Sequence, residues 1–349
     1  MQEPAMSTQI EAHVASRALP RQTAGHTLGR ITCGASNAGF AATTTAMATQ
    51  HVYAKQLHPA EAMYEEYWFS QQPTRCGHGA QLNYHYSEDV FFGVIEIHEP
   101  EHLVDGVHPL NHAAYTAYLK LFDTLDTFNF KYLWRAWNYM PSITGTSHGQ
   151  ERYQQFNAGR QRGFALSSRS VTGNVPAACA LGVNGGPLSV AFLAGRSPTR
   201  PIENPRQVSA YHYPAQYGSQ SPTFSRASLA QVQQQELLFL SGTASIVGHQ
   251  TVHVGDVKNQ TIETLANIQA VIDQANLRKQ GHQAFGPQDL QLRVYVRHAQ
   301  DCDAVRAIVN THWGWAVQAV YLQADICRAD LDVEIEGIAW HTMPTPPAT

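Results

Sequence analysis

The chain has 349 residues, of which 14% are charged and 43% are hydrophobic. This length predicts roughly two domains with a sizeable core, and the composition excludes a disordered protein. Lys and Arg number 23 against 27 Asp and Glu, which gives a formal net charge of -4. Nucleic acids and anionic membranes attract basic proteins, so we expect neither as a partner and favour a small molecule.

The cysteines and the N-terminus indicate where the protein works. The five cysteines are widely spaced and form no C-x-x-C pair, so we expect neither a disulfide framework nor a zinc knuckle. The first residues lack the basic region and apolar run of a signal peptide. Residues 31–54 carry no Asp, Glu, Lys or Arg, but their many Ala, Thr, Ser and Gly residues favour ordered loop and strand over a membrane span. We therefore predict a cytoplasmic protein.

Strand and helix patterns alternate in the first half of the chain. β-Branched and aromatic residues at 91–98 predict a strand. Apolar residues then recur at helical spacing along 110–125, a helix that Asn111 could cap. Residues 131–139 return to an extended aromatic pattern. This half therefore contains a β-α-β unit.

The second half follows the same plan. An apolar stripe predicts a long helix over residues 256–274, and alternating apolar residues predict a strand at 290–297. Asp301 can cap a short helix that runs to residue 309, and a further strand follows at 316–323. No fixed-period repeat accompanies this similarity, which suggests two structurally related halves rather than a repeat array.

We place the domain boundary near residue 150, at a change in composition. The expected order is a tail at 1–28, a domain at 29–150, a second domain at 151–342 and a tail at 343–349. Residues 151–230 stand out because they hold eight arginines, no lysine and only two acids. Aromatic residues lie among these arginines: Tyr153, Phe156, Tyr211, Tyr213, Tyr217 and Phe224.

Such a segment has the chemistry to bind a small cyclic di-acid. Guanidinium groups bind carboxylates through paired hydrogen bonds, and aromatic side chains can form walls around a ring. For any single arginine, an ordinary solvated surface charge is the simpler interpretation. The cluster as a whole favours a binding site more than its individual members do.

The strand predicted at residues 331–340 carries the strongest candidate for acid chemistry. Its alternation places Asp332, Glu334 and Glu336 on one face and apolar residues on the other. If the acidic face lines a cleft, burial and mutual repulsion raise one pKa into the range of a general acid. Alternation alone is more typical of an antiparallel edge strand with its polar face in water. Cys327 has no activating His or Lys nearby in the sequence, so we interpret it as a pocket wall and not as a nucleophile.

Three further motifs have simple interpretations. Among eighteen histidines, only His249 and His253 have a tempting metal-ligand spacing, and the adjacent glycines favour a loop, so we expect no metal. Residues 182–187 are rich in glycine but lack the spacing of a phosphate-binding or dinucleotide-binding loop, which indicates a turn. Residues 241–245 (SGTAS) lack the spacing of a nucleophile elbow and indicate close packing against a ligand or a tight turn.

Several segments of the C-terminal third follow one another in the order and spacing of a known family: Ser241-Gly242-Thr243, Gly255-Asp256, Gln260, 264–268 (TLANI) and 333–339 (VEIEGIA). They resemble the reactive-intermediate deaminases (RidA, YjgF-like), whose fold is an α+β, chorismate-mutase-like βαβ sandwich. That family keeps an arginine in the strand before the V-E-I-E segment, whereas residues 316–325 contain none. The resemblance implies the fold, and the missing arginine argues against deaminase activity.

Longer motifs cover most of the chain: 132–139 (YLWRAWNY), 151–160 (ERYQQFNAGR), 202–207 (IENPRQ), 211–214 (YHYP), 221–226 (SPTFSR) and 241–245 (SGTAS). These motifs look like those of the chorismatases. The resemblance implies an α+β protein of two RidA/YjgF-like domains, with its active site in a cleft. It also implies removal of the enolpyruvyl group of chorismate as pyruvate, without a metal or an organic cofactor.

The resemblance further implies roles for individual residues. Glu334 would be the general acid that protonates the enolpyruvyl methylene, and water or a ring hydroxyl would capture the resulting oxocarbenium ion. Tyr153, Arg160, Tyr213 and Arg226 match family positions that we assign to substrate binding.

Three more residues complete the expected site. Tyr211, two residues before Tyr213, is expected to face the same way on a strand. Ala244 and Cys327 are expected to line the pocket and to decide the ring product. The cysteine looks like the hydroxybenzoate-forming branches, and the alanine is also seen in the hydrolytic branch. This mixture looks most like the branch that gives both 3- and 4-hydroxybenzoate.

Other functions stay open at this stage. One alternative is a chorismate hydrolase that gives 3,4-dihydroxycyclohexa-1,5-diene carboxylate and pyruvate. The others are a RidA-like enamine or imine deaminase and a non-catalytic metabolite-binding protein. The oligomeric state cannot be read from the sequence, although two RidA-like halves in one chain would already form the cleft between them and so allow a monomer.

Overall fold

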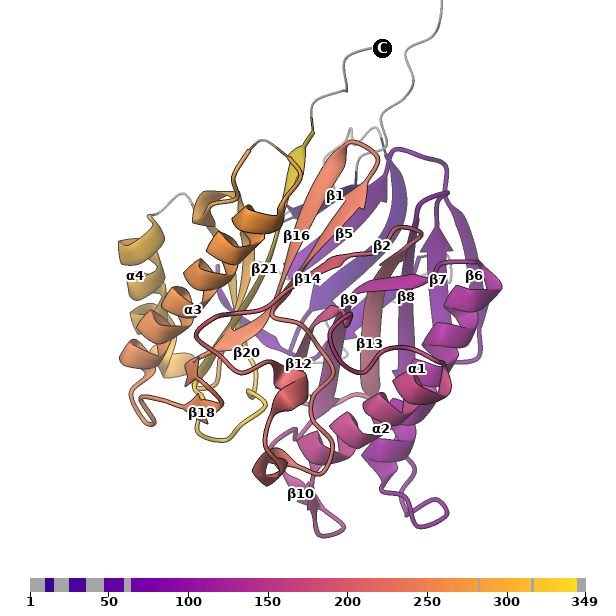
Figure 1. The fold of residues 1–349 in the computed structure, drawn as a ribbon. Helices are drawn as coiled ribbons and strands as arrows, with labels where there is room; N and C mark the ends of the chain where they lie inside the picture. Colours follow the sequence, from indigo (N-terminus) through magenta and orange to yellow (C-terminus); the bar gives the residue numbers. More distant parts are fainter. Residues whose placement is uncertain are drawn as a thin grey trace, which may run out of the picture.

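The computed structural model describes residues 10–15, 25–35, 47–59, 64–281, 283–314 and 317–343. Two large sheets face one another, and helices cover their outer sides (Figure 1). The first sheet has the order β12-β9-β13-β8-β7-β6. Its strands are β6 (Arg75–Gly79), β7 (Leu82–Tyr86), β8 (Val90–Ile97), β9 (Tyr132–Pro141), β12 (Ala177–Val183) and β13 (Leu188–Gly195). Helices α1 (Pro109–Thr127) and α2 (Arg152–Leu166) pack on its outer face.

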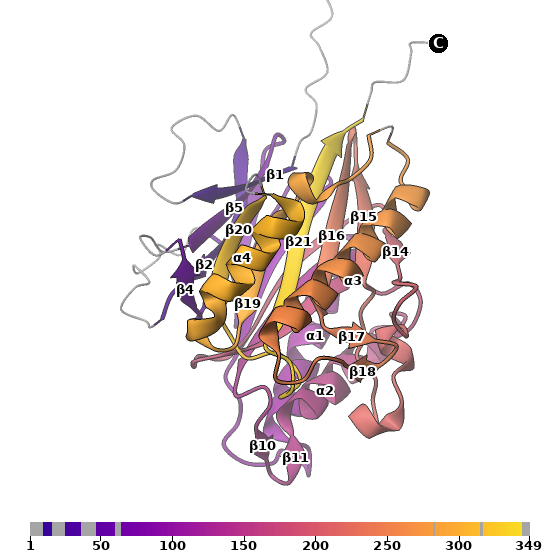
Figure 2. The same ribbon diagram turned by 90° about the vertical axis from the view of Figure 1, so that its left-hand side faces the viewer.

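The second sheet has the order β14-β15-β16-β21-β19-β20-β4. Its strands are β4 (Lys55–His58), β14 (Arg200–Ile202), β15 (Ala227–Val232), β16 (Gln235–Ala244), β19 (Gln291–Val296), β20 (Gln318–Gln323) and β21 (Val333–Thr342). Helices α3 (Val257–Arg278) and α4 (Cys302–Trp313) cover it, as Figure 2 shows.

Smaller elements complete the described part of the chain. A third sheet has the order β1-β5-β2-β3, with β1 (Ile10–Ala15), β2 (His26–Cys33), β3 (Thr49–Val52) and β5 (Tyr64–Ser70). Two short ribbons pair β10 (Thr146–Ser147) with β11 (Gln150–Glu151), and β17 (Ile246–Val247) with β18 (Gln250–Thr251). The 3₁₀ turns are η2 (Ala210–His212), η3 (Ala215–Tyr217), η4 (Pro287–Asp289) and η5 (Ala299–Asp301).

The two large sheets share one topology. The order β12-β9-β13-β8-β7-β6 in the first corresponds to β20-β19-β21-β16-β15-β14 in the second. In both sheets the pair joined through a helix, β9 with β12 and β19 with β20, is parallel, and the other neighbours within these six are antiparallel. The α+β class and the two related halves are therefore confirmed. The second half adds one edge strand, β4, from the N-terminal part of the chain.

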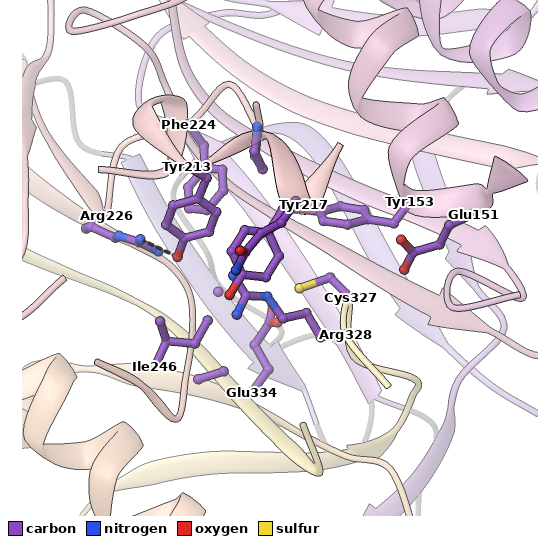
Figure 3. A pocket seen from close by; sticks show the side chains of 14 residues that line it. Glu151, Tyr153, Tyr213, Tyr217, Phe224, Arg226, Ile246, Cys327, Arg328 and Glu334 are labelled. Carbon is purple, nitrogen blue, oxygen red and sulfur yellow. Dashed lines mark hydrogen bonds between the residues drawn. The ribbon is translucent and has the colours of Figure 1, made fainter. Parts of the chain in front are cut away.

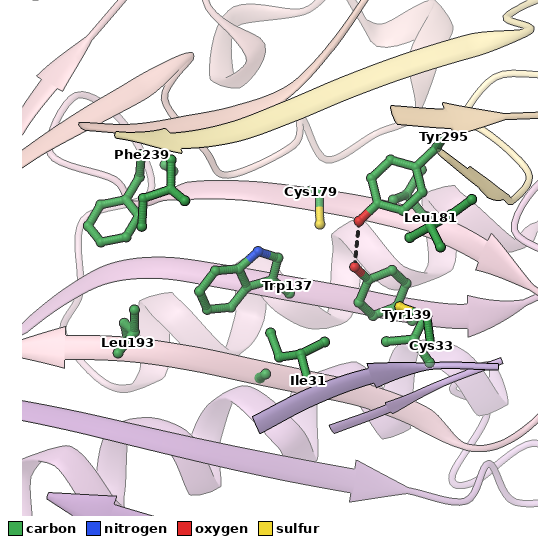
Figure 4. Close-up of a cluster of buried hydrophobic side chains, with 14 of the residues drawn as sticks. Ile31, Cys33, Trp137, Tyr139, Cys179, Leu181, Leu193, Phe239 and Tyr295 are labelled. Carbon is green, nitrogen blue, oxygen red and sulfur yellow. Dashed lines mark hydrogen bonds between the residues drawn. The ribbon is translucent and has the colours of Figure 1, made fainter. Parts of the chain in front are cut away.

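A hydrogen bond joins equivalent positions of the two halves. Tyr139 in β9 pairs with Leu181, and Tyr295 in β19 pairs with Leu322, each the fifth residue of the parallel neighbour. The two tyrosine hydroxyls lie 2.6 Å apart in the core between the sheets (Figure 4). Both are fully buried, so this bond satisfies polar atoms that would otherwise have lost their water. It also fixes how the two sheets face one another.

The structure corrects two predicted helix starts. Helix α1 begins after His108 with Pro109 in its first turn, so Asn111 lies inside the helix instead of capping it. Proline suits this position because its missing N–H would have no helical partner there. Asp301 does precede α4, but its side chain makes no capping hydrogen bond. Asp256, by contrast, caps α3 by accepting a hydrogen bond from the backbone N–H of Asn259 at 3.1 Å.

The sheet topology also corrects the expected domain limits. Strands β12 and β13 belong to the first sheet, and α2 packs on α1, so the first unit continues to Gly195 instead of ending near residue 150. The expected N-terminal tail at 1–28 contains β1 and the start of β2. Both errors have one cause, because local patterns identify strands but not their distant partners. The expected C-terminal tail lies outside the described residues, apart from Met343. No helix of the described chain is long and apolar enough to cross a membrane.

Candidate active site

A pocket opens where the two halves meet (Figure 3). The first half contributes α2 with the β11 strand before it, and the second half contributes β16, β21 and the loops beside them. The pocket is lined by Glu151, Tyr153, Tyr213, Gln216, Tyr217, Pro222, Phe224, Arg226, Gly242, Ala244, Ile246, Cys327, Arg328 and Glu334. A deeper recess shares part of this wall and adds Arg160, Ala178, Cys179 and Ala180.

Glu334 is the buried acid of this pocket, which Glu151 also lines. It stands on β21 opposite Ala244 of β16, and only 4% of the residue is exposed. Burial, followed by the negative charge of Glu336, raises the pKa of Glu334 to about 8, against the opposing charges of Arg135 and Arg226. No hydrogen bond from a described residue contributes to this shift. Glu334 is therefore a carboxyl group that keeps its proton near neutral pH and points into a pocket.

Gly242 makes room for this carboxyl group. The pairing of β16 with β21 shifts register between Leu240 and Thr243, which is the mark of a β-bulge. A Cβ at position 242 would overlap the Oε1 atom of Glu334. Beside it, the hydroxyl of Ser241 accepts a hydrogen bond from the N–H of Ala178 at 2.9 Å, which ties the bulge to the first half. The SGTAS segment was expected either to pack closely against a ligand or to form a tight turn. In the structure it packs closely against Glu334, a carboxyl group of the protein itself.

Arg226 supplies positive charge on one side of the pocket. It is 4% exposed, and its Nη2 donates to the carbonyl of Val208 at 2.7 Å and to the hydroxyl of Tyr213 at 2.8 Å. Its Nε is buried without a partner. Burial raises the pKa of Glu203, and the nearby Arg226 opposes this shift without forming an ion pair with it among the described residues. Donor capacity therefore remains for a bound anion.

Arg160 lies in the deeper recess, on helix α2. It is 1% exposed, and its Nη2 donates to Oδ1 of Asn157 at 2.9 Å. Its Nε has no hydrogen-bond partner among the described residues. Arg160 also forms no ion pair with any described residue. A buried guanidinium without a carboxylate is costly. A bound anion would lower that cost.

Arg328 is a third cation of the pocket, and the sequence reasoning missed it. It follows the expected wall residue Cys327 in the loop between β20 and β21. Its guanidinium stacks over Tyr217 at 4.0 Å from the ring centre and donates to the carbonyl of His249 at 2.9 Å. Its Nη2 is buried without a partner. The only signal in the sequence was its place next to Cys327.

Cys327 and Tyr153 form apolar walls. Burial and the neighbouring Glu334 raise the pKa of the Cys327 thiol to about 12, so the sulfur stays protonated and is a poor nucleophile. Burial likewise raises the pKa of the Tyr153 hydroxyl. Tyr153 stacks on Phe156 of the same helix, with ring centres 6.5 Å apart. These observations agree with the predicted wall role of Cys327.

The structure brings together every expected site residue except one: Glu334, Tyr153, Arg160, Tyr213, Arg226, Ala244 and Cys327 all line the pocket or its recess. Tyr211 does not. It lies in η2, where its ring contacts His212, and Tyr213 lies after that turn, so the expectation of a shared strand face was wrong. A 3₁₀ turn has three residues per turn, so residues two apart do not share a face.

The arginine cluster divides into two groups. Arg160 and Arg226 line the pocket and its recess, whereas the other six contact groups of the protein elsewhere and are not simply solvated charges. Four form ion pairs: Arg152 with Glu99, Arg169 with Asp126, Arg200 with Glu236 and Arg206 with Glu263. Arg162 stacks on Tyr115, and Arg196 donates to backbone carbonyls.

The two histidines considered as metal ligands have other contacts. Nδ1 of His249 lies 3.3 Å from the hydroxyl of Tyr217, and Nε2 of His253 lies 3.6 Å from a carboxylate oxygen of Glu263. Within the part of the chain that the structure describes, no group of three or more His, Cys, Asp or Glu residues is placed to hold a metal ion.

Fold and site together define a class: a two-domain α+β protein whose interdomain pocket combines a buried carboxyl group of raised pKa with three cations that form no ion pair with the described residues. Residues 66–194, which end with the first sheet, match the family model described as chorismatase FkbO/Hyg5-like, N-terminal. The chain is 34% identical to a 3-hydroxybenzoate synthase of Streptomyces hygroscopicus, over 80% of this chain and 82% of that protein. It is 35% identical to a chorismatase of the same organism, over 79% of each chain.

A solved structure agrees over nearly the whole length. A chorismatase crystal structure superimposes with a TM-score of 0.85 at 30% identity, covering 96% of this chain and 100% of that chain. The chain belongs to the chorismatase family. The predicted family and the predicted enzyme class are thereby confirmed.

Proposed function

We propose that this chorismatase removes the enolpyruvyl group of chorismate as pyruvate, with Glu334 as the general acid, and releases hydroxybenzoate. The observation that carries the proposal is the buried carboxyl group of Glu334, whose pKa of about 8 keeps it protonated in a pocket lined by cations. A general acid must hold its proton at the working pH and face the group it protonates.

The pocket has the charges that chorismate requires. Chorismate carries two carboxylates, one on the ring and one on the enolpyruvyl side chain. Arg160 lines the recess, and Arg226 and Arg328 line the main pocket, so cations are available in both spaces. Each retains a buried guanidinium nitrogen without a partner. We propose that these groups bind the two carboxylates, with Tyr153 and Tyr213 beside the ring.

The chemistry starts with transfer of the Glu334 proton to the terminal methylene carbon of the enolpyruvyl group. The electron pair of the double bond forms the new C–H bond and leaves an oxocarbenium ion. The carboxylate that Glu334 becomes stabilises this cation. In the hydrolytic route, water adds to the cationic carbon, and cleavage of its bond to the ring oxygen releases pyruvate. In the internal route, the ring hydroxyl adds to the cationic carbon and forms a cyclic ketal. One ketal C–O bond then breaks and leaves its oxygen on the ring, while the other oxygen leaves its ring carbon as the carbonyl oxygen of pyruvate and the ring loses a proton to become aromatic. Glu334 recovers its proton in the later steps.

The ring product depends on which oxygen attacks. Attack by a ring hydroxyl needs no net water, because hydroxybenzoate and pyruvate together contain the atoms of chorismate. Attack by water gives the dihydroxycyclohexadiene carboxylate instead. We propose that the pocket walls at Ala244 and Cys327 favour the internal route and give 3-hydroxybenzoate, 4-hydroxybenzoate or both. The relative named 3-hydroxybenzoate synthase supports this choice.

A single chain is proposed to suffice, because both halves of one chain line the pocket. A cytoplasmic location is proposed as well, since all five cysteines are free thiols, as is usual in a reducing compartment.

The test is to incubate purified, metal-stripped protein with chorismate, to follow pyruvate with a coupled assay and to identify the ring product by chromatography with mass detection. Hydroxybenzoate with an equal amount of pyruvate supports the proposal. A non-aromatic dihydroxy acid would keep the family activity but move the enzyme to the hydrolytic branch. Glu334→Gln is the matched control, because it keeps the shape and removes the acidic proton. Full turnover by that variant would disprove the general-acid role.

Two other functions predict different results. A metabolite-binding protein would bind chorismate, as measured by calorimetry, and release no pyruvate. A RidA-like deaminase would release ammonia from enamine or imine substrates and leave chorismate unchanged.

A further inference from the structure

We propose that Glu336 is a positioning residue which, from within a buried ion network, keeps the catalytic proton on Glu334. The inference rests on the proposed role of Glu334 as general acid. It explains why two glutamates on the same face of β21 would do different work.

Glu336 accepts hydrogen bonds from three donors. It is 2% exposed, and Arg135 Nη2 donates to its Oε2 atom. The hydroxyl of Tyr295 donates to its Oε1 atom at 2.6 Å, and Arg293 Nη1 donates to the same atom at 3.2 Å. Charge-assisted bonds of this kind stabilise the ionised form. Glu334, two residues earlier, receives no such donors from the described residues.

The network continues away from the pocket to a second acid. Arg293 Nη2 lies 2.6 Å from Oε1 of Glu66, which also accepts from Trp68 Nε1 at 2.9 Å. The hydroxyl of Tyr64 donates to the other oxygen of Glu66 at 2.6 Å. Two arginines therefore face two glutamates, and the network is neutral overall. A negative charge on Glu334 would be an additional anion beside it, which Arg135 and Arg226 offset only in part.

The short spacing along β21 makes this coupling strong. Residues two apart on a strand lie on the same face, about 7 Å apart. At that distance in a buried region, the anion of Glu336 disfavours a second anion at Glu334. Arg135 also contacts the backbone beside Glu334. Its Nη1 donates to the carbonyl of Leu240 at 2.9 Å, and the bulge that accommodates Glu334 begins at Leu240.

Other groups also face this pair, and all of them except Arg135 are unchanged in Glu336→Gln, Glu66→Gln and Arg135→Gln. Titratable or charged groups that interact with Glu334 or line its pocket and recess are Arg135, Glu151, Tyr153, Arg160, Cys179, Tyr213, Tyr217, Arg226, Cys327 and Arg328. Those that interact with Glu336 are Cys33, Arg135, Tyr139, Cys179, Arg293, Tyr295 and Glu334. None of these groups adds an acid within hydrogen-bond distance of Glu334 in the described structure.

The test compares Glu336→Gln with Glu66→Gln. The pH dependence of kcat/KM for pyruvate release reports the ionisation of the free enzyme, and activity should fall as Glu334 loses its proton. This fall in activity is the alkaline limb of the pH profile. In Glu336→Gln, removal of the neighbouring anion should move the alkaline limb to lower pH by about one unit. Glu66→Gln removes a charge from the far side of the same network, so its limb should stay closer to that of the wild type.

A variant that shifts the alkaline limb in the opposite direction distinguishes the proposed effect from a general loss of structure. Arg135→Gln removes a cation near Glu334 and leaves Glu336 charged, so its alkaline limb should move to higher pH. Circular dichroism confirms that each variant is folded. An unchanged limb in folded Glu336→Gln, or equal shifts for Glu336→Gln and Glu66→Gln, would overturn the proposal. Full activity of Glu334→Gln would instead disprove the proposed function itself, so the two failures are distinguishable.

Discussion

Gly242 faces the carboxyl group of Glu334 so closely that no side chain fits between them. We predict that Gly242→Ala lowers kcat by about 100-fold, because the new methyl group would displace the carboxyl group by roughly 1 Å or more. Pyruvate release from chorismate measures this effect. Gly79→Ala is the control, since a Cβ there meets no atom within 4 Å, and it should leave kcat unchanged. Equal activity of the two variants would show that the placement of Glu334 does not matter.

The raised pKa of Glu334 predicts a pH-dependent effect on stability. The folded protein holds this proton up to about pH 8, whereas an unfolded glutamate loses it near 4.5, so folding is favoured at low pH and loses this contribution as the pH rises from 4.5 through 8. Glu334→Gln does not ionise. Relative to the wild type, it should therefore gain roughly 4 kcal/mol in the free energy of unfolding between pH 5 and pH 8.5. Urea titrations at both pH values measure the difference, and equal differences at the two values would contradict the raised pKa.

Arg160 should control substrate affinity. Arg160→Lys keeps the charge but loses the planar fork and the hydrogen bond to Asn157, and we expect KM for chorismate to rise by about 10-fold to 100-fold. Steady-state kinetics with purified variants measure this change. Arg162→Lys lies two residues along the same helix, on its exposed side over Tyr115, and should leave KM within about twofold. A similar change in both variants would point to a general effect on the helix.

Cys327 should affect the identity of the product rather than the release of pyruvate. Cys327→Ala enlarges the pocket beside Glu334, and we expect the proportion of the ring products to change while pyruvate formation continues within about 10-fold of the wild type. Chromatography with mass detection gives the proportions. Cys302→Ala removes a thiol from helix α4, away from the pocket lining, and should leave them unchanged. Complete loss of pyruvate in folded Cys327→Ala would indicate a catalytic thiol, against the wall role.

The sequence predicted those features of the site that depend on residues close together in the chain. The alternation around Glu334 placed two glutamates on one strand face, and the motifs with Arg160 and Arg226 indicated cations for carboxylates. The β-α-β pattern likewise predicted two related halves, which the matching strand orders confirm. Strand alternation and side-chain chemistry act over a few residues, so they can be read without knowing the fold.

Tertiary structure decided everything that joins distant segments. Only the fold shows that the acidic face of β21 is buried and not in water, that Arg328 enters the pocket, and that β13 ends the first sheet. It also decided the different surroundings of two chemically identical side chains. Glu336 accepts a hydrogen bond from Arg135 of the other sheet, whereas Glu334 faces Gly242, where burial and the negative charge of Glu336 raise its pKa to about 8.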